Sequence, residues 1–384
     1  MTEWKEYKLG EIADITPGFA FKSKDFGPKG ELVVKIKDII PPYIDLSNSD
    51  HVDLTNYDMD KLKKYLLSEG DYAVAMTGAT IGKVGKMKTH QKAYLNQRVA
   101  KIKAKDGFCD DFVYYSINGD DFQTFIQNNI DSNSAQENIS ANSIARFSVM
   151  LPSLDTQRRI ASILTSLDDK IDLLRRENAT LEAMAETLFR QWFVVEAKEE
   201  WEEGKLGDVC KYVADKIDIT DIERDTYITT ENMCPNKQGV VKPSSIPENI
   251  KVTKYLVNDV LLSNIRPYFK KLWLSDRNGG CSNDVLCIRS KNEVFKYFTY
   301  YTIRQDEFFD YVMLGSKGCK MPRGDKQHIM NWQIKIPSDA ILNSFNEIVG
   351  KGIAKIRNNN RQIQTLIQTR DGLLPRLMGG EIKI

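Results

Sequence analysis

Two stretches of the chain repeat apolar residues at steps that alternate between four and three. The first runs from Thr156 to Trp192, with charged residues such as Asp168 and Arg175 between the repeating positions. The second runs from 339 to 378 in the same phase, interrupted by polar residues at 346 and 370. This pattern is typical of a coiled-coil seam and predicts two long helices. The seam positions are Ile160, Leu164, Leu167, Ile171, Leu174, Asn178, Leu181, Ala185, Leu188 and Trp192, then Leu342, Val349, Ile353, Ile356, Asn360, Ile363, Ile367, Leu374 and Leu377.

The two helices are expected to pair with each other, because a single seam without a partner would be insoluble. The segment between them, residues 193–338, is long enough to be a domain, so the returning chain indicates an antiparallel arrangement. Asn178 and Asn360 lie at seam positions with apolar neighbours, where an asparagine fixes the register at some cost in stability. Pairing between two chains is the alternative that the sequence leaves open.

The regions before the two helices resemble each other. Residues 4–12 read WKEYKLGEI and residues 201–209 read WEEGKLGDV, and Asp71 later corresponds to Asp259. Such a repeat indicates an internal duplication. At 384 residues the chain is long enough for two or three domains. It is interpreted as a globular domain at 1–152, a spacer helix at 153–195, a second globular domain at 196–337, and a second spacer helix with a tail at 338–384.

Each globular domain is expected to mix strands and helices, which gives an α+β fold of two similar domains, each followed by a long helix. Strand patterns lie at 71–76, 99–102, 260–262 and 285–288. Helical spacing with aromatic residues on the apolar face lies at 112–128 and 295–314, and these aromatics are interpreted as core. The segments 77–85, 131–142, 263–271 and 315–325 are rich in Gly, Asn, Ser, Lys and Arg. They are expected to be exposed loops that carry binding residues.

The charge of these loops is uneven, although the formal net charge of the chain is only +1. Residues 83–105 hold eight basic residues and no acidic one, and short acid-free basic clusters recur at 266–271 and 317–323. Such clusters suit a phosphate backbone, and the amide side chains among them can bond base edges. The alternative is solvated lysines that protect strand edges. The candidate DNA-binding residues are Thr77, Lys83, Lys86, Asn96, Gln97, Arg98, Ser134, Gln136, Asn138, Asn264, Arg266, Lys270, Lys271, Ser316, Lys317, Lys320 and Arg323.

Catalytic motifs are incomplete. Residues 78–84, GATIGKV, are one residue short of a phosphate loop, and Val84 replaces the hydroxyl that would hold magnesium. Ile40 precedes Pro41-Pro42-Tyr43 where an amino-methyltransferase motif needs Asn or Asp. No glycine fingerprint for a dinucleotide or S-adenosylmethionine follows a predicted strand. The sequence therefore predicts no catalytic residue and no cofactor.

The six cysteines form no CxxC pair and are interpreted as reduced thiols of a cytoplasmic protein. Cys281 and Cys287 with the distant His328 match no zinc spacing, so no metal site is expected. The first ten residues do not resemble a signal peptide. No apolar run approaches the ~18 residues of a membrane span.

Several motifs resemble those of one family. Residues 151–164, LPSLDTQRRIASIL, and 181–193, LEAMAETLFRQWF, resemble the central repeat of the DNA specificity subunits of type I restriction-modification enzymes. Residues 373–378, LLPRLM, followed by GEI at 380–382, resemble the end of their second repeat, with Gly379 where a serine is usual. Residues 75–85, AMTGATIGKVG, are similar to a loop of their target-recognition domains. The resemblance covers essentially the whole chain.

The resemblance implies a non-catalytic subunit whose two target-recognition domains each read one half of a split, asymmetric sequence in double-stranded DNA. The antiparallel helices would hold the domains apart and dock two methyltransferase subunits, and restriction subunits would join the complex. Methylation of adenine and ATP-driven cleavage would belong to those partners. A helix of roughly 35 residues is about 50 Å long, comparable with one to one and a half turns of duplex at ~34 Å per turn.

One end of the first helix is more apolar than a two-helix seam requires. Phe189, Trp192 and Phe193 are therefore expected to contact the modification subunits or a globular domain. Two other functions are weighed against the DNA specificity subunit. One is a non-catalytic two-domain protein-interaction scaffold with a coiled-coil spacer, and the other is a self-contained methyltransferase, which the missing motifs disfavour.

Overall fold

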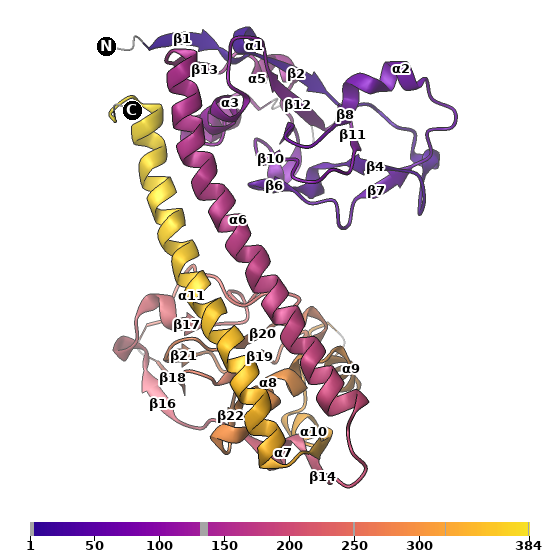
Figure 1. The fold of residues 1–384 in the computed structure, drawn as a ribbon, viewed down its shortest axis with the longest axis vertical. Coiled ribbons are helices and arrows are strands. Elements are labelled where there is room, and N and C mark those ends of the chain that lie inside the picture. Colours follow the sequence, from indigo (N-terminus) through magenta and orange to yellow (C-terminus); the bar gives the residue numbers. More distant parts are fainter. Residues whose placement is uncertain (1–3, 131–136, 249, 319, 383) are drawn as a thin grey trace. The chain divides into compact units, whose positions relative to one another are not determined.

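The computed structural model describes residues 4–130, 137–248, 250–318, 320–382 and 384. The chain divides into two compact units, the first formed by Met1–Asp172 and Gln364–Ile384 and the second by Leu173–Ile363. Two long helices, α6 (Leu154–Arg190) and α11 (Asp339–Met378), each lie partly in unit 1 and partly in unit 2 (Figure 1). The helices predicted at 156–192 and 339–378 are thus confirmed, and a π-helical turn at Gln191–Val195 extends the first.

Unit 1 holds two larger sheets and a two-stranded pair. The sheets have the strand orders β2-β12-β9-β10-β6-β5 and β3-β7-β4-β11-β8, and the pair is β1-β13. Its elements are β1 (Lys5–Lys8), α1 (Leu9–Ile12), β2 (Ala13–Pro17), β3 (Phe26–Gly27), β4 (Glu31–Val34), β5 (Ile39–Ile40), β6 (Tyr43–Ile44), β7 (Asp50–Val52), α2 (Met59–Leu62), β8 (Leu66–Leu67), β9 (Tyr72–Ala75), β10 (Val84–Lys86), β11 (Ala93–Leu95), β12 (Val99–Ala104), α3 (Asp110–Ser116), α4 (Asp120–Asn128), α5 (Ala141–Ile144) and β13 (Ser148–Leu151).

Unit 2 repeats this plan with fewer strands. Its sheets have the orders β15-β22-β19-β20 and β16-β18-β21-β17, and its two-stranded pair is β14-β23. Its elements are β14 (Glu202–Lys205), α7 (Leu206–Val209), β15 (Cys210–Tyr212), β16 (Lys216–Asp218), β17 (Tyr227–Ile228), β18 (Lys251–Tyr255), β19 (Val260–Ser263), β20 (Leu272–Leu274), β21 (Gly279–Cys281), β22 (Val285–Ser290), α8 (Lys296–Arg304), α9 (Asp306–Leu314), α10 (Lys326–Met330) and β23 (Gln333–Ile336).

The internal duplication is confirmed by equivalent hydrogen bonds in the two units. In unit 1, β12 pairs with β9 so that Val99 faces Ala75, and in unit 2, β22 pairs with β19 so that Val285 faces Ser263. The predicted strands at 71–76, 99–102, 260–262 and 285–288 are these four strands. The carboxylate of Asp71 accepts a backbone N–H from Ser68 at 3.0 Å, just as Asp259 accepts one from Leu256 at 2.7 Å. The two domains therefore share the arrangement of their central strands.

The predicted helices at 112–128 and 295–314 are each a pair of helices. Gly119 interrupts the first as the extended N-cap of α4, and Gln305 interrupts the second with φ −62° and ψ 145°. Their aromatic residues are core, as predicted. Phe112, Phe122, Phe298 and Phe308 are all nearly fully buried.

The long helices pair within the chain and run antiparallel, as predicted. Arg370 binds Asp168 at 2.8 Å, and Asn178 donates to Asn360 at 2.8 Å, so advancing along α6 means going back along α11. All predicted seam positions except Asn360 are buried or half-buried, but at several of them an adjacent residue is the more buried one. Asn359 is fully buried while Asn360 is exposed, and Asp168 is more buried than Leu167. An α-helix repeats every 3.6 residues, so a strict 3.5-residue seam drifts around its surface.

Candidate nucleic-acid interface

The candidate loop of unit 1 comprises residues 76–83, between β9 and β10. Its first residue, Met76, donates a backbone hydrogen bond to Arg98 at 2.9 Å and accepts one from Ile139 at 2.9 Å. Thr77 forms an isolated bridge with Asn138. The fold thus brings together three segments that lie far apart in sequence and that carry the predicted residues Thr77, Arg98 and Asn138. Ser134 and Gln136 lie outside the described residues.

Two predicted residues of unit 1 are occupied by contacts inside the protein. Thr77 is 2% exposed, and its hydroxyl donates to the carbonyl of Glu137 at 2.8 Å. The Lys86 ammonium binds Asp111 at 2.7 Å, and the hydroxyl of Tyr72 donates to the same carboxylate oxygen. Burial raises the pKa of Asp111, but Lys86 and Tyr72 outweigh it and hold the pKa below its usual value. Both side chains therefore stabilise the domain. Lys83, Gln97 and Asn138 are exposed, and Asn96 is half-buried.

The candidate loop of unit 2 comprises residues 264–271, between β19 and β20, and has the same length as the 76–83 loop. Asn264 donates a backbone hydrogen bond to Asp284 at 2.9 Å, and Arg266 donates one to Pro322 at 2.8 Å. Arg323 bridges both Ile265 and Lys317. The two predicted loops of unit 2 thus form one junction, which also includes the turn before β22.

The cations around this junction have acidic neighbours that a count along the sequence does not show. Arg323 lies 3.3 Å from Asp284, and Lys317 lies 3.0 Å from Asp325. Both cations are exposed, and ion pairs at such positions are weak. Asp325 caps α10, where the backbone N–H of His328 and the Lys317 ammonium lower its pKa to about 2.

Of the remaining predicted residues of unit 2, one is exposed and three bind other groups of the protein. Lys320 is exposed, whereas the hydroxyl of Ser316 donates to the carbonyl of Val312 at 2.7 Å. The Lys271 ammonium donates to the carbonyl of Thr230 at 2.5 Å. Lys270 binds Asp306 at 2.9 Å. These three predicted residues thus each have a partner within the protein.

Three further residues, two in the 264–271 loop and one beside it, are not among the residues predicted from the sequence. Lys237 belongs to a turn that hydrogen-bonds to this loop, with its backbone N–H donating to Lys270 at 2.8 Å. Tyr268 and Phe269, on the loop itself, are 47% and 37% exposed. Exposed aromatic rings in nucleic-acid-binding loops can stack on bases or enter a groove. The adjacent aromatic pair between Pro267 and Lys270 was the available signal, whereas nothing in the sequence around Lys237 indicates its neighbour.

The apolar end of α6 belongs to the core of unit 2. Phe189 and Phe193 are 4% and 8% exposed and pack against Phe298 and Phe345. Of the two contacts predicted for these side chains, the structure has the one with a globular domain, and Phe189 and Phe193 leave little exposed surface for a modification subunit. Trp192 is half-buried and lines a hollow of about 410 Å³ with Trp201 and Ile341.

A different face of α6 is open in unit 2. A shallow groove of about 770 Å³ runs along it, and Met184 in this groove is 63% exposed. The lining residues recur at helical spacing and are small, apolar or uncharged: Ala179, Thr180, Ala183, Met184, Thr187, Leu188 and Gln191.

Among the described residues, no three His, Cys, Asp or Glu side chains are grouped to hold a metal ion. Cys281 and Cys287, considered above with His328, are buried. In the same part of the chain, no helix is long and apolar enough to cross a membrane.

The chain is similar in sequence and fold to specificity subunits of type I restriction enzymes. Residues 1–183 match the family model of the type I restriction modification DNA specificity domain. The specificity subunit of the type I restriction enzyme MjaIX from Methanocaldococcus jannaschii is 25% identical over 334 residues, which cover 75% of this chain and 73% of the relative. That of EcoBI from Escherichia coli is 28% identical over 306 residues, 74% of this chain and 59% of the relative. The crystal structure of a type I restriction-modification S subunit from M. genitalium shares the fold, with a TM-score of 0.61, 13% identity, and coverage of 98% of this chain and 96% of that one.

Proposed function

We propose that the chain is a specificity subunit of a type I restriction-modification system, as the match of residues 1–183 to the DNA specificity domain and the similarity to the MjaIX specificity subunit support, and that it directs its complex to a bipartite, asymmetric DNA target. Residues 1–152 and 196–337 would be the two target-recognition domains, each reading one half of the target. The subunit itself would be non-catalytic. Adenine methylation and DNA cleavage would be carried out by the methyltransferase and restriction subunits with which it assembles.

The observation that supports this proposal is the repeated junction of three segments. In each unit, the loop after a central strand, the turn before its partner strand and a third, distant segment are tied together by backbone hydrogen bonds. Exposed side chains suited to phosphates or base edges lie on both junctions, Lys83, Gln97 and Asn138 on one and Lys320 and Arg323 on the other. A rigid scaffold that displays such loops is the usual arrangement for recognition.

The two halves of the target would differ, because equivalent loop positions carry different chemistry. Gly78 corresponds to Arg266 and Gly82 to Lys270, since Lys83 and Lys271 accept equivalent hydrogen bonds from Ala75 and Ser263. Arginine makes paired hydrogen bonds to guanine, which glycine cannot. The half-site of unit 2 is therefore expected to include a base pair read by Arg266.

The paired helices would set the spacing between the two half-sites and dock the modification subunits. For the docking surface we propose the open face of α6 lined by Ala183, Met184 and Thr187, which replaces the buried Phe189 and Phe193 in this role. Small and apolar side chains allow a partner helix to approach closely and bury apolar area. Met184→Lys should weaken assembly with the methyltransferase subunits and leave DNA binding by the isolated chain unchanged.

Titrating duplex DNA binding with salt tests the DNA-binding role. Phosphate neutralisation predicts a linear fall of log affinity with log salt, with a slope near −0.9 for each phosphate contacted. Lys83→Ala should weaken binding by about 1–3 kcal/mol if it reads a base, and by less if it contacts phosphate. Lys351→Ala, which removes an exposed lysine of α11 paired with Glu347, is the matched control.

Mapping modified adenine in DNA methylated by the reconstituted complex tests the bipartite target. The expected result is one split motif with unlike halves. Methylation without such a motif, or no salt-dependent binding to any duplex, would contradict the proposal and favour the protein-interaction scaffold.

A further inference from the structure

Residues with strained backbone cluster in the 264–271 loop and in the turn that hydrogen-bonds to it. Among the described residues, five non-glycine residues have a positive φ, and four of them lie here: Asn236 at 53°, Lys237 at 61°, Arg266 at 50° and Lys270 at 50°. Backbone hydrogen bonds of 2.8 Å from Asn236 to Phe269 and from Lys237 to Lys270 tie the two strained segments together. A left-handed residue with a side chain costs roughly 1–2 kcal/mol. Such strain persists where the surrounding structure enforces it, often at functional sites.

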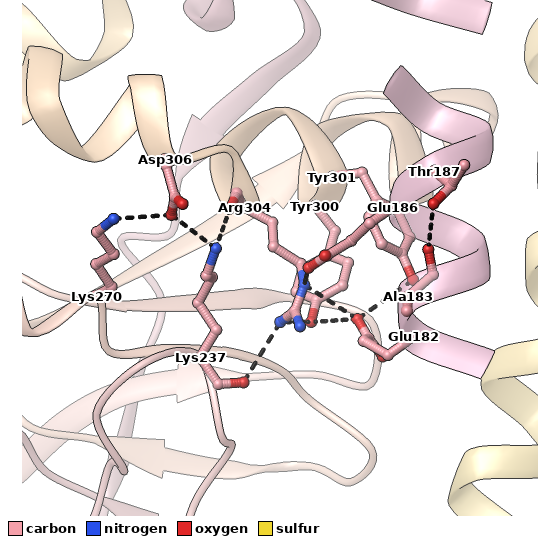
Figure 2. A network of polar contacts seen from close by, with 10 residues as sticks. All are labelled: Glu182, Ala183, Glu186, Thr187, Lys237, Lys270, Tyr300, Tyr301, Arg304 and Asp306. Carbon is pink, nitrogen blue, oxygen red and sulfur yellow. Dashed lines mark hydrogen bonds and ion pairs between the residues drawn. The ribbon is translucent and has the colours of Figure 1, made fainter. Parts of the chain in front are cut away.

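Two of these strained residues direct their ammonium groups to one carboxylate oxygen. Lys237 and Lys270 both lie 2.9 Å from Oδ1 of Asp306, one on each side of it (Figure 2). The lysine side chains are 16% and 27% exposed, whereas the Asp306 side chain is 60% exposed. The carboxylate is thus the most accessible member of the three. Lys270 and Lys237 lower the pKa of Asp306, so the group is ionised at neutral pH.

One of the two lysines is held in place by further contacts. The Lys237 ammonium also donates to the carbonyl of Arg304 at 3.0 Å, and the backbone carbonyl of Lys237 accepts from the Arg304 guanidinium at 3.4 Å. Arg304 in turn pairs with Glu186 and, at 3.2 Å, with Glu182 on α6 (Figure 2). The position of the Lys237 ammonium is therefore fixed by the α8–α9 connection and by α6, and does not depend on Asp306 alone.

We propose that Lys237 and Lys270 form a binding site for a backbone phosphate of DNA, which the Asp306 carboxylate occupies while the protein is free. This inference rests on the proposed DNA-binding function. A phosphate oxygen and a carboxylate oxygen offer the same charge and acceptor chemistry to an ammonium group. Rotation of the exposed Asp306 side chain is enough to clear the site, so the fold need not change. A duplex that fails to make the specific contacts must still displace the carboxylate, and Asp306 therefore disfavours non-specific binding.

Among the described residues of unit 1, no such pair of cations lies at the equivalent loop position. Gly82 stands where Lys270 does, and its carbonyl accepts a hydrogen bond from Gln123 at 2.8 Å. The equivalent loop is thus held by an uncharged contact that offers no cation to a phosphate.

Binding of the full-length chain to a random-sequence duplex, titrated with salt, tests the proposal. Asp306→Asn should bind this duplex roughly tenfold more tightly than the wild type, with a salt slope steeper by about one. Glu307→Gln is the matched control, since it removes one exposed negative charge from the next residue. Lys270→Gly should keep the left-handed backbone, bind several-fold more weakly, and abolish the gain when combined with Asp306→Asn.

The outcomes separate this inference from the proposed function. If wild-type protein binds duplex DNA but Asp306→Asn binds no better than Glu307→Gln, the phosphate site is wrong and the specificity function stands. If Asp306→Asn binds inorganic phosphate at millimolar concentration more tightly than the wild type but binds the duplex no better, the site takes free phosphate and the DNA assignment is wrong. If the wild type binds no duplex, both proposals fail.

Discussion

The loops at 76–83 and 264–271 follow the same backbone path with different residues. In unit 1 the left-handed positions are glycines, Gly78 at 72° and Gly82 at 79°, which adopt this conformation without strain. In unit 2 they are Arg266 and Lys270. The Nε of Arg266 is also buried and has no hydrogen-bond partner within the described residues. The path itself needs only glycine at these positions, so folding alone does not account for the two cations of unit 2.

The helix seam shows the same contrast. Asp168 and Arg370 form a largely buried ion pair in unit 1, and the hydroxyl of Tyr115 donates to Asp168 at 2.7 Å. The equivalent seam positions in unit 2 are Ile353 and Ala185, which pack in its apolar core. Unit 1 therefore has an ion pair where unit 2 has apolar packing. Copying the apolar pair into unit 1 tests what the ion pair contributes to stability.

Arg370→Ala should have the largest effect on stability. It leaves Asp168 buried without its cation, which should lower the free energy of unfolding by about 2–4 kcal/mol. The double variant Asp168→Ile with Arg370→Ala copies unit 2 and should recover most of this loss. Denaturant unfolding followed by circular dichroism measures both. Equal losses in the single and double variants would show that the charge pair is not what distinguishes the two seams.

Arg266→Gly should separate stability from binding. Giving unit 2 the glycine of unit 1 relieves the left-handed strain and removes the buried, unpaired Nε, so stability should stay equal or rise. Affinity for a cognate duplex should fall by about 1–3 kcal/mol. Titration of duplex binding, together with thermal unfolding, tests this pair of outcomes. A loss of stability with unchanged affinity would mean that Arg266 serves the fold.

The reverse change in unit 1 should destabilise it. Gly82→Ala forces a side chain into a left-handed backbone, and its Cβ would lie 2.9 Å from Oε1 of Gln123. The expected loss is about 1–2 kcal/mol of unfolding free energy. At the equivalent site, the wild-type Lys270 already carries a Cβ in the left-handed conformation. Lys270→Ala adds none and should therefore change stability much less. If the two alanine variants lose equally, the loops do not differ in the way described.

The smallest effect should be a pH dependence of the α10 cap in unit 2, which the equivalent cap in unit 1 lacks. Asp325 caps α10, whereas its counterpart in unit 1, Ser140, caps α5 and does not titrate. The pKa of Asp325 is lowered from 3.8 to about 2, so its stabilising contribution is present above pH 3.8 and lost as pH falls toward 2. Asp325→Ser should therefore be less stable than wild type at pH 6, and this difference should shrink at low pH. A constant difference across that range would exclude the ionised cap as its cause.

Local sequence patterns were enough to predict the helices, the four central strands and the duplication, because heptad spacing, strand alternation and repeated segments are visible along the chain. The candidate site was predicted only in outline. Counting cations between residues 83 and 105 could not show that Asp111 holds Lys86, and the run around Lys270 could not show Asp306. Such pairings depend on residues brought together by the tertiary fold. For the same reason, the apolar end of α6 could be identified but not assigned to the core of unit 2.

The asparagine contact of the helix seam limits how the spacer can vary by mutation. Asn178 donates to Asn360, and the buried Asn359 donates to Asn178 and Glu177, each at 2.9 Å. An insertion in α6 between Asp168 and Asn178 would break this match unless a matching insertion occurred between Asn360 and Arg370. The alignment of these contacts thus depends jointly on the lengths of two segments that lie far apart in the sequence. A single insertion or deletion in either helix would shift one set of contacts against the other.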